Sequence, residues 1–347
     1  MSTAILFNGA ASYIAQEAGI LDLLLGNVDD VPGVGLNIQD VKFVGGLSSG
    51  ALMSFIFNAA FCDSPKLSWD EFKQNILFTM TTDKVYTGEK PFDTSPLRKL
   101  LQNITQQVGY TLIKDLPFDS AILATNLYLL RNKTYWFTNI AKVASVLPSQ
   151  TDKLTIAKNI KEHQLELGLV SSLMCSTAIP GTFPMQKLYY KGNFPLPLPI
   201  KNSAGIAADF VDGGVGDNLV FSDYQEFFEV YGEKFDKIYF ISPNFAKTEA
   251  EALQRISLAK RSDALEEEEP GIDPLLIMDT WTNNFLKDLK AYNSGGRLAN
   301  TIYYCKPEVE GFNPLDFSNE QEQYQATIEW GQNNQDKIAI DINSIAM

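Results

Sequence analysis

The sequence predicts an α/β protein with a mainly parallel sheet, and two observations lead to that class. Short apolar runs recur along the chain, and they are continuous rather than alternating, which suits strands buried on both faces of a sheet. Segments with apolar residues at helical spacing separate these runs. Such alternation is typical of parallel strands joined by right-handed crossover helices.

The apolar runs give the predicted strands, and helical patterns fill much of the chain between them. The strands are predicted at Ala4–Phe7, Lys42–Val44, Ala121–Ala124, Lys237–Ile241 and Thr301–Tyr304. The helices are predicted at about 11–25, 49–61, 68–80, 95–108, 152–162, 166–176, 222–231, 275–291 and 319–332. We expect a single domain over 1–347, with a core at about 3–245 and a helical C-terminal extension at about 246–347.

Two segments have the composition of loops. Phe194–Ile200 alternates proline with bulky apolar residues, so it cannot be a central strand. We expect a packed surface loop there, with an apolar lip that touches lipid as the alternative. Glu266–Pro270 is a run of like charges, and we expect a solvated linker. Neither segment is expected to mark a domain boundary.

The formal net charge of −14 excludes some classes of partner. Nucleic-acid phosphates demand a basic protein surface, so no nucleic-acid partner is expected. Electrostatic docking to an anionic membrane is disfavoured as well, because each nearby Lys or Arg contributes about 1 kcal/mol to it. Any peripheral membrane contact is therefore expected to use apolar loops.

The cysteines and the N-terminus bear on the compartment. Cys62, Cys175 and Cys305 are far apart, and no Cys or Cys/His spacing suits a metal. Each has apolar neighbours, so we expect buried free thiols, which fits a reducing cytoplasm. The chain shows neither the basic start of a signal peptide nor the roughly 18 apolar residues of a membrane span. We expect a cytoplasmic protein, with leaderless export left open.

The most informative motif is Gly46–Gly50, which has the form Gly-x-Ser-x-Gly around Ser48. An apolar strand precedes it and an apolar helix follows it, which is the arrangement of a nucleophile elbow in acyl hydrolases. The flanking small residues permit a sharp turn, and the helix N-terminus favours a developing alkoxide. The alternative is a glycine-rich turn in which the serine caps the helix.

A serine nucleophile needs a base, and histidine is the usual one. The single histidine, His163, ends a polar helical pattern and is expected on the surface. Asp212 follows a short apolar run and precedes two glycines, so it is the best candidate base. Its ordinary pKa of about 3.9 is low for this task, but burial in an apolar pocket raises such values. An ordinary Asp-Gly turn is the alternative.

The exit of the first strand, Asn8–Tyr13, leads into a helix and exposes backbone N–H groups. Such groups form oxyanion holes, and the N–H of the residue after the nucleophile usually contributes one donor. The candidate donors are therefore the N–H groups of Gly9, Ala10, Ala11 and Ser49. A plain helix N-terminus is the alternative.

Four separated segments together resemble the patatin-like phospholipases. Val44–Ala51 resembles the nucleophile elbow of that family, and Val211–Val215, with Asn218 shortly after, resembles its Asp-Gly-Gly motif. Cys175–Pro184 is similar to the intervening Ser-x-Ala-x-Pro segment, and Gly19–Leu21 lies where the first helix of the family carries Gly-Val-Leu. The order of the segments also matches.

The resemblance implies a three-layer α/β/α fold and a serine carboxylic-ester hydrolase of the phospholipase A or lysophospholipase type. Its substrate would be a lipid or a small acyl ester, and it would need no cofactor or metal. By position, Ser48 would be the nucleophile and Asp212 its base, without histidine. A catalytically weak or inactive lipid-binding protein is the alternative, and an acyltransferase or thioesterase is a second one.

The oxyanion loop departs from the family pattern, which is a glycine run followed by an arginine. In this chain the loop falls on Gly9, Ala10 and Ala11, and Tyr13 stands in place of the arginine. Alanine at a backbone position with positive φ costs about 1 kcal/mol or more relative to glycine. The loop is therefore expected to be reshaped or to weaken catalysis.

Overall fold

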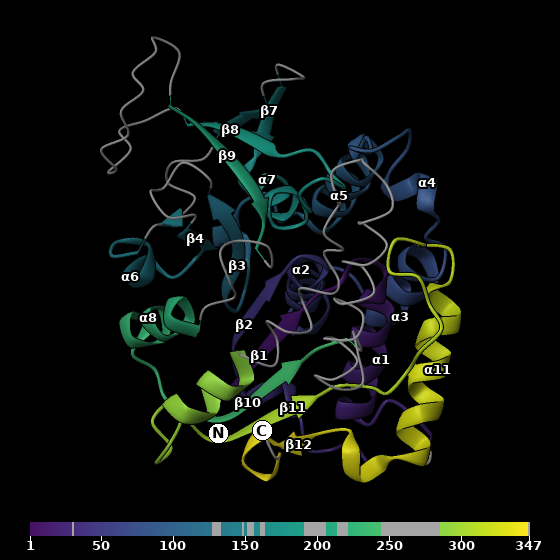
Figure 1. The fold of residues 1–347 in the computed structure, drawn as a ribbon, viewed down its shortest axis with the longest axis vertical. Helices are drawn as coiled ribbons and strands as arrows, with labels where there is room; N and C mark the ends of the chain where they lie inside the picture. The colour runs from purple at the N-terminus through teal and green to yellow at the C-terminus, as the bar shows by residue number, and fades with distance from the viewer. Residues whose placement is uncertain are drawn as a thin grey trace, which may run out of the picture.

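The computed structural model describes residues 1–29, 31–126, 133–147, 149–150, 156–159, 164–190, 206–213, 221–243 and 285–345 (Figure 1). Several features of the sequence lie outside the described residues: His163, Asn218, Phe194–Ile200 and Glu266–Pro270.

The described strands form one 12-stranded sheet, ordered β12-β11-β10-β1-β2-β3-β9-β8-β6-β7, with β4 pairing to β3 and to β5. Their bounds are β1 Thr3–Asn8, β2 Val41–Leu47, β3 Asp119–Asn126, β4 Lys133–Thr138, β5 Ser149–Gln150, β6 Ile156–Asn159, β7 Gln164–Leu167, β8 Gln186–Tyr190, β9 Ile206–Asp212, β10 Phe235–Ile241, β11 Ala299–Cys305 and β12 Ile340–Asp341.

All the strands predicted from apolar runs are present, and they form one contiguous block. In this block β11, β10, β1, β2 and β3 run parallel to one another. Beyond it, β4 and β9 pair antiparallel with β3, and β8, β6 and β7 continue in antiparallel fashion, so the sheet as a whole is mixed. Parallel strands end at the same edge of a sheet, so the segments that follow β1, β2 and β3 gather there.

The helices have the following bounds: α1 Ile14–Leu25, α2 Ser49–Phe61, α3 Trp69–Phe72, α4 Thr82–Val85, α5 Ser95–Val108, α6 Ala141–Ala144, α7 Gly168–Ser176, α8 Phe221–Tyr231 and α11 Glu320–Asn333. A short 3₁₀ turn, η1, covers Ala11–Tyr13, and residues 285–292 are also helical.

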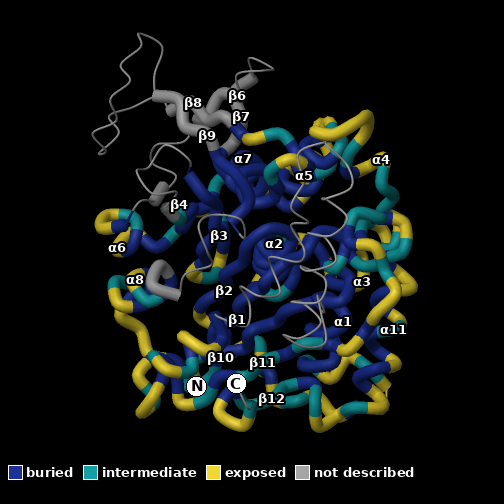
Figure 2. Tube along the Cα trace, in the orientation of Figure 1, coloured by how far each residue is buried: buried dark blue, intermediate teal, exposed yellow. Residues whose placement is uncertain are grey.

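Helices cover both faces of the sheet, which confirms the three-layer α/β/α class. Ile5 and Phe7 of β1 face a core that includes α1, α2 and α11. Ala4 and Leu6, which point the other way, face a core that includes α6, α8 and the helix at 285–292. Figure 2 shows the central strands and α2 as the most buried part of the molecule.

Some predicted helices differ from the structure. The prediction of a helix at 152–162 is wrong where the structure describes it, because Ile156–Asn159 is strand β6, paired with β7 and β8. The helix predicted at 166–176 begins at Gly168, since β7 occupies the residues before it. The helix predicted at 68–80 is divided into α3 and a π-helical turn, Lys73–Leu77. Sheet pairing outweighs the local pattern in β6 and β7.

The C-terminal extension supplies strands as well as helix, since β11 and β12 belong to the central sheet. Its helix α11 packs closely on α1. A Cβ at Gly19 would lie 2.8 Å from the Thr327 side chain, so glycine permits this approach. The Tyr324 hydroxyl donates a hydrogen bond of 2.6 Å to the buried Asp22 carboxylate. Among the described residues, no helix combines the length and apolar character of a membrane span.

Candidate active site

Ser48 occupies a sharp turn between β2 and α2. Its φ of 53° and ψ of −132° are unusual for a residue with a side chain, and it shares positive φ with only one other described non-glycine residue, Ala11. Small neighbours make the turn possible, because a Cβ at Gly46 would lie 2.1 Å from the Gly50 carbonyl oxygen. The strand–turn–helix arrangement predicted from the sequence is therefore present.

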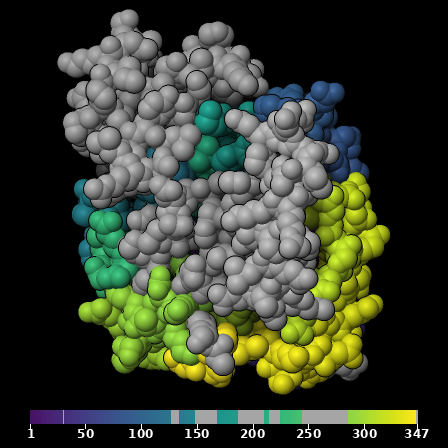
Figure 3. All heavy atoms as spheres, in the orientation of Figure 1, coloured from purple at the N-terminus to yellow at the C-terminus, as the bar shows by residue number. Residues whose placement is uncertain are grey.

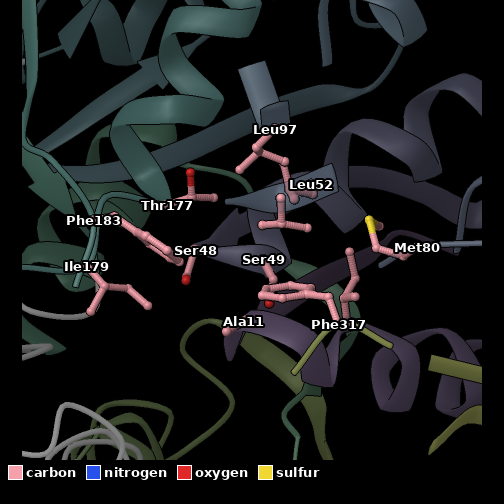
Figure 4. A pocket seen from close by; sticks show the side chains of 12 residues that line it. Ala11, Ser48, Ser49, Leu52, Met80, Leu97, Thr177, Ile179, Phe183 and Phe317 are labelled. Carbon is pink, nitrogen blue, oxygen red and sulfur yellow. The ribbon is translucent and has the colours of Figure 1, made fainter. Parts of the chain in front are cut away.

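Ser48 lies beside an apolar cavity. Twelve of the described residues line this cavity, whose empty volume is about 440 Å³ when space open to solvent is included (Figure 4). Ser48, Ser49 and Thr177 are the hydroxyl residues among them, and the other nine are apolar. Ser48 is only 3% exposed and precedes the first turn of α2, where the helix dipole is positive. A hydroxyl in this position can attack an apolar acyl group held in the cavity.

Asp212 is the last residue of β9 and is 1% exposed. Its backbone is fixed on both sides: its N–H donates to the Ala178 carbonyl at 2.8 Å, and the Thr125 hydroxyl donates to its carbonyl at 3.2 Å. The carboxylate is therefore held on a rigid strand rather than on a loose Asp-Gly turn.

The sheet register relates Ser48 to Asp212. Leu47, which precedes Ser48, pairs with Leu123 of β3, and the next residue of β3, Ala124, pairs with Asp212. Ser48 and Asp212 therefore lie near the same edge of the sheet, on strands that flank β3. Two strand spacings correspond to about 10 Å between their backbones.

The last residue of α7 and the segment that follows it contact Ser48 and Asp212. The Ser48 N–H donates to the Ser176 hydroxyl at 2.9 Å, and that hydroxyl donates to the Leu123 carbonyl at 2.5 Å. Two residues later, the Ala178 carbonyl accepts the Asp212 N–H. The sequence marked this segment only as part of a family pattern, and the contacts of Ser176 have no signal in a single sequence.

The loop after β1 packs against the start of α2. A Cβ at Gly9 would lie 2.0 Å from the Gly50 nitrogen, so this glycine is needed for the close approach. The Ala10 N–H donates to the Ser49 hydroxyl at 2.8 Å, so this candidate oxyanion donor is already engaged. Ala11 has a φ of 51°, the left-handed region in which alanine is strained.

Ala11 and Ser49 are the candidate oxyanion donors that line the cavity together with Ser48. Ala11 is the first residue of η1 and Ser49 is the first residue of α2. The N–H of a first helical residue has no acceptor within its own helix.

Tyr13, which stands in place of the family's arginine, contacts the C-terminal part of the chain. Its hydroxyl donates to the Phe312 carbonyl at 2.7 Å. Next to it, the Ser12 N–H donates to the Pro314 carbonyl at 2.9 Å. The changed loop is thus joined to a segment about 300 residues away in sequence, a contact that the sequence did not reveal.

The remaining reactive groups lie apart from this cavity. Cys62, Cys175 and Cys305 are buried, as predicted, and they form no disulfide. Burial raises the pKa of the Cys305 thiol, which keeps it protonated. In the part of the chain that the structure describes, no group of three or more His, Cys, Asp or Glu residues is arranged to hold a metal ion.

Comparison with known proteins identifies the family. A sequence model described as patatin-like phospholipase matches residues 5–223. No curated protein matches the chain. Among solved structures, a chain of the heterodimeric ExoU–SpcU complex from the type III secretion system of Pseudomonas aeruginosa has 12% sequence identity and a TM-score of 0.31. The alignment covers 85% of this chain and 60% of that one, so this chain spans less than two thirds of its length. Since the family match covers more than half of the residues, the chain belongs to the patatin-like phospholipases, a family of lipid acyl hydrolases.

Proposed function

We propose that the protein hydrolyses carboxylic esters of lipids, as a phospholipase A or lysophospholipase does, through a dyad of Ser48 and Asp212. The observation that carries the proposal is the strained turn at Ser48, which presents a hydroxyl to an apolar cavity of about 440 Å³. The apolar lining of this cavity suits an acyl chain.

In the first half of the reaction, Asp212 accepts the proton of Ser48 Oγ as this oxygen attacks the ester carbonyl carbon. The carbon–oxygen bond to the alcohol then breaks, and the departing alkoxide takes the proton from Asp212. The products of this half-reaction are the free alcohol, such as a lysolipid, and an acyl ester on Ser48.

The N–H groups of Ala11 and Ser49 would stabilise the negative charge that develops on the carbonyl oxygen. Both residues line the cavity beside Ser48, and the N-terminus of α2 adds its dipole to the same region. The hydrogen bonds from Ala10 to Ser49 and from Ser12 to Pro314 hold the backbone around Ala11 and Ser49 in place. An oxyanion hole must be organised in this way before the charge appears.

In the second half, Asp212 accepts a proton from a water molecule, and the resulting hydroxide attacks the acyl carbon. The bond to Ser48 Oγ breaks, Oγ recovers the proton from Asp212, and the fatty acid leaves. The Asp212 N–H donates to the Ala178 carbonyl and the Asp212 carbonyl accepts from the Thr125 hydroxyl, and these two bonds would keep the residue in place through both halves.

A fluorophosphonate probe and a fatty-acid release assay on phospholipid vesicles test the proposal. We expect the protein to take up the probe and to release fatty acid, and we expect Ser48→Ala to abolish both. Ser54→Ala is the matched control, because Ser54 is a buried serine within α2 whose hydroxyl donates to the Val44 carbonyl and which does not line the cavity. Absence of labelling and of turnover in the folded protein would refute the hydrolase.

A second candidate function is lipid binding with weak catalysis. The bond from the Ala10 N–H to the Ser49 hydroxyl removes one oxyanion donor, and a lost donor typically costs about a hundred- to a thousandfold in turnover. Under this alternative the protein binds fatty acid in the cavity and turns over esters slowly, and Ser48→Ala changes neither the binding nor the turnover appreciably. Measuring binding and turnover on the same preparation separates the two functions.

A further inference from the structure

We propose that Phe317 sets the longest acyl chain that the cavity accepts. The proposal rests on the proposed acyl hydrolysis at Ser48 and adds a determinant of substrate choice. Phe317 lies outside the stretch that matches the family, at residues 5–223. This specificity would therefore come from a part of the chain outside the family match.

The Phe317 ring forms part of the cavity wall and is only 7% exposed. In Figure 4, Phe183 lies on one side of Ser48, while Phe317 and Met80 lie on the other side. The Phe317 ring also meets the Tyr86 ring edge-on, at a centroid distance of 6.2 Å. An acyl chain that extends from Ser48 in this direction meets the aromatic ring.

Hydrogen bonds fix the backbone that carries this ring. The Phe317 N–H donates to the Thr82 hydroxyl at 3.1 Å, and the Tyr86 hydroxyl donates to the Leu315 carbonyl at 2.8 Å. At the other end of the segment, Tyr13 bonds to Phe312. Figure 3 shows the C-terminal region, in yellow, adjoining the blue region of α4 and α5 on the surface.

A wall held in this way limits chain length for a physical reason. Each methylene that the cavity buries favours binding by roughly fourfold, but a methylene that meets a packed wall strains the site instead. The segment that carries Phe317 is hydrogen-bonded to other parts of the chain at several points, so displacing the segment breaks several hydrogen bonds together. Removing the ring alone creates space without breaking them.

The test compares a series of p-nitrophenyl esters with acyl chains of rising length. We expect Phe317→Ala to move the maximum of kcat/KM toward longer chains. For these longer esters, kcat/KM should rise roughly fourfold for each additional methylene that the cavity admits. Phe317→Trp should move it toward shorter chains. Phe312→Ala is the matched control, because Phe312 lies in the same segment and packs against the core but does not line the cavity.

A binding measurement keeps this inference separate from the proposed catalysis. In the Ser48→Ala background, saturated fatty acids of rising length are titrated into the protein with and without Phe317→Ala. We expect the longer acids to gain affinity in the double variant. If Phe317→Ala shifts fatty-acid binding while the protein with Ser48 intact shows no esterase activity, the proposed hydrolase is refuted and the inference about Phe317 stands. Unchanged chain-length profiles in both assays, with folded Phe317→Ala and Phe317→Trp proteins, would overturn it.

Discussion

The N–H of Ser48 donates a hydrogen bond of 2.9 Å to the hydroxyl of Ser176. Ser176 is fully buried, and its hydroxyl donates a hydrogen bond to the Leu123 carbonyl, so the turn at Ser48 is tied to strand β3. Since Asp212 is held against the same strand, one hydroxyl links the supports of both candidate catalytic residues. Ser176 would act as a positioning residue in the proposed reaction.

Replacing Ser176 by alanine should therefore lower turnover more than substrate binding. The variant leaves the Ser48 N–H and the Leu123 carbonyl without this partner, at a cost of about 1–3 kcal/mol for each buried group. If part of this cost falls on the geometry of attack, kcat drops roughly ten- to a hundredfold and KM changes little. Steady-state kinetics with a soluble ester give both constants.

Ser172→Ala provides the control for this prediction. Ser172 is also a buried serine of α7, but its hydroxyl bonds to the Gly168 carbonyl of its own helix at 2.6 Å. A structural loss alone would affect both variants to a similar degree. Equal kcat values for the Ser172 and Ser176 variants would show that Ser176 has no positioning role.

The sequence predicted the central strands and the Ser48 turn, which carry the candidate site, better than the elements around them. The strands β1, β2, β3, β10 and β11 were identified because each is a continuous apolar run, and the turn at Ser48 because its glycines leave a strong local pattern. The strand β6 was predicted as a helix, although it pairs with β7, which follows it closely in the chain, and with the more distant β8. Local patterns report periodicity, whereas strand pairing is a long-range property.

The same distinction applies within the candidate site. Ser48 and Asp212 were singled out from local motifs, but the contribution of Phe317 depends on a segment near the end of the chain meeting the loop after β1. Tyr13 appeared in the sequence only as a departure from a family pattern. Its bond to the Phe312 carbonyl gives the departure a structural role that no spacing indicates.

Tyr13→Phe tests that role. The variant removes the hydroxyl that bonds to Phe312 but keeps the ring, so we expect the free energy of unfolding to fall by about 1 kcal/mol. The loop containing Ala11 should then be held less firmly, and kcat should decrease several-fold. Thermal melting and esterase kinetics measure the two effects. A variant with the stability and activity of the parent would mean that this contact contributes nothing.

Ala11→Gly should relieve backbone strain. Ala11 has a φ of 51°, where alanine costs about 1 kcal/mol or more relative to glycine. We therefore expect the substitution to leave the free energy of unfolding unchanged or to raise it slightly, although it removes a buried methyl group. Ala18→Gly, within the interior of α1, should instead destabilise the protein by about 1 kcal/mol or more. Denaturant titration of both variants compares them, and equal losses would contradict the strain at Ala11.

Glu320 predicts a pH dependence of stability. Its side chain is buried at the start of α11, and burial raises its pKa from the ordinary 4.5 to about 8, with the charge of Asp316 acting in the same direction. The folded protein therefore holds this proton more tightly than the unfolded chain does. As pH rises from about 4.5 to about 8, this residue lowers the free energy of unfolding, and above that range its effect is constant.

Glu320→Gln removes the titration, so its stability relative to the parent should increase over this pH interval and level off above it. Melting temperatures measured from pH 4 to pH 9 give the difference at each pH. Glu322→Gln is the control, because Glu322 lies in the same helical turn but is exposed, and its difference from the parent should vary little. A constant difference between Glu320→Gln and the parent at every pH would show that Glu320 ionises at the same pH in the folded and unfolded chains, which its burial beside Asp316 argues against.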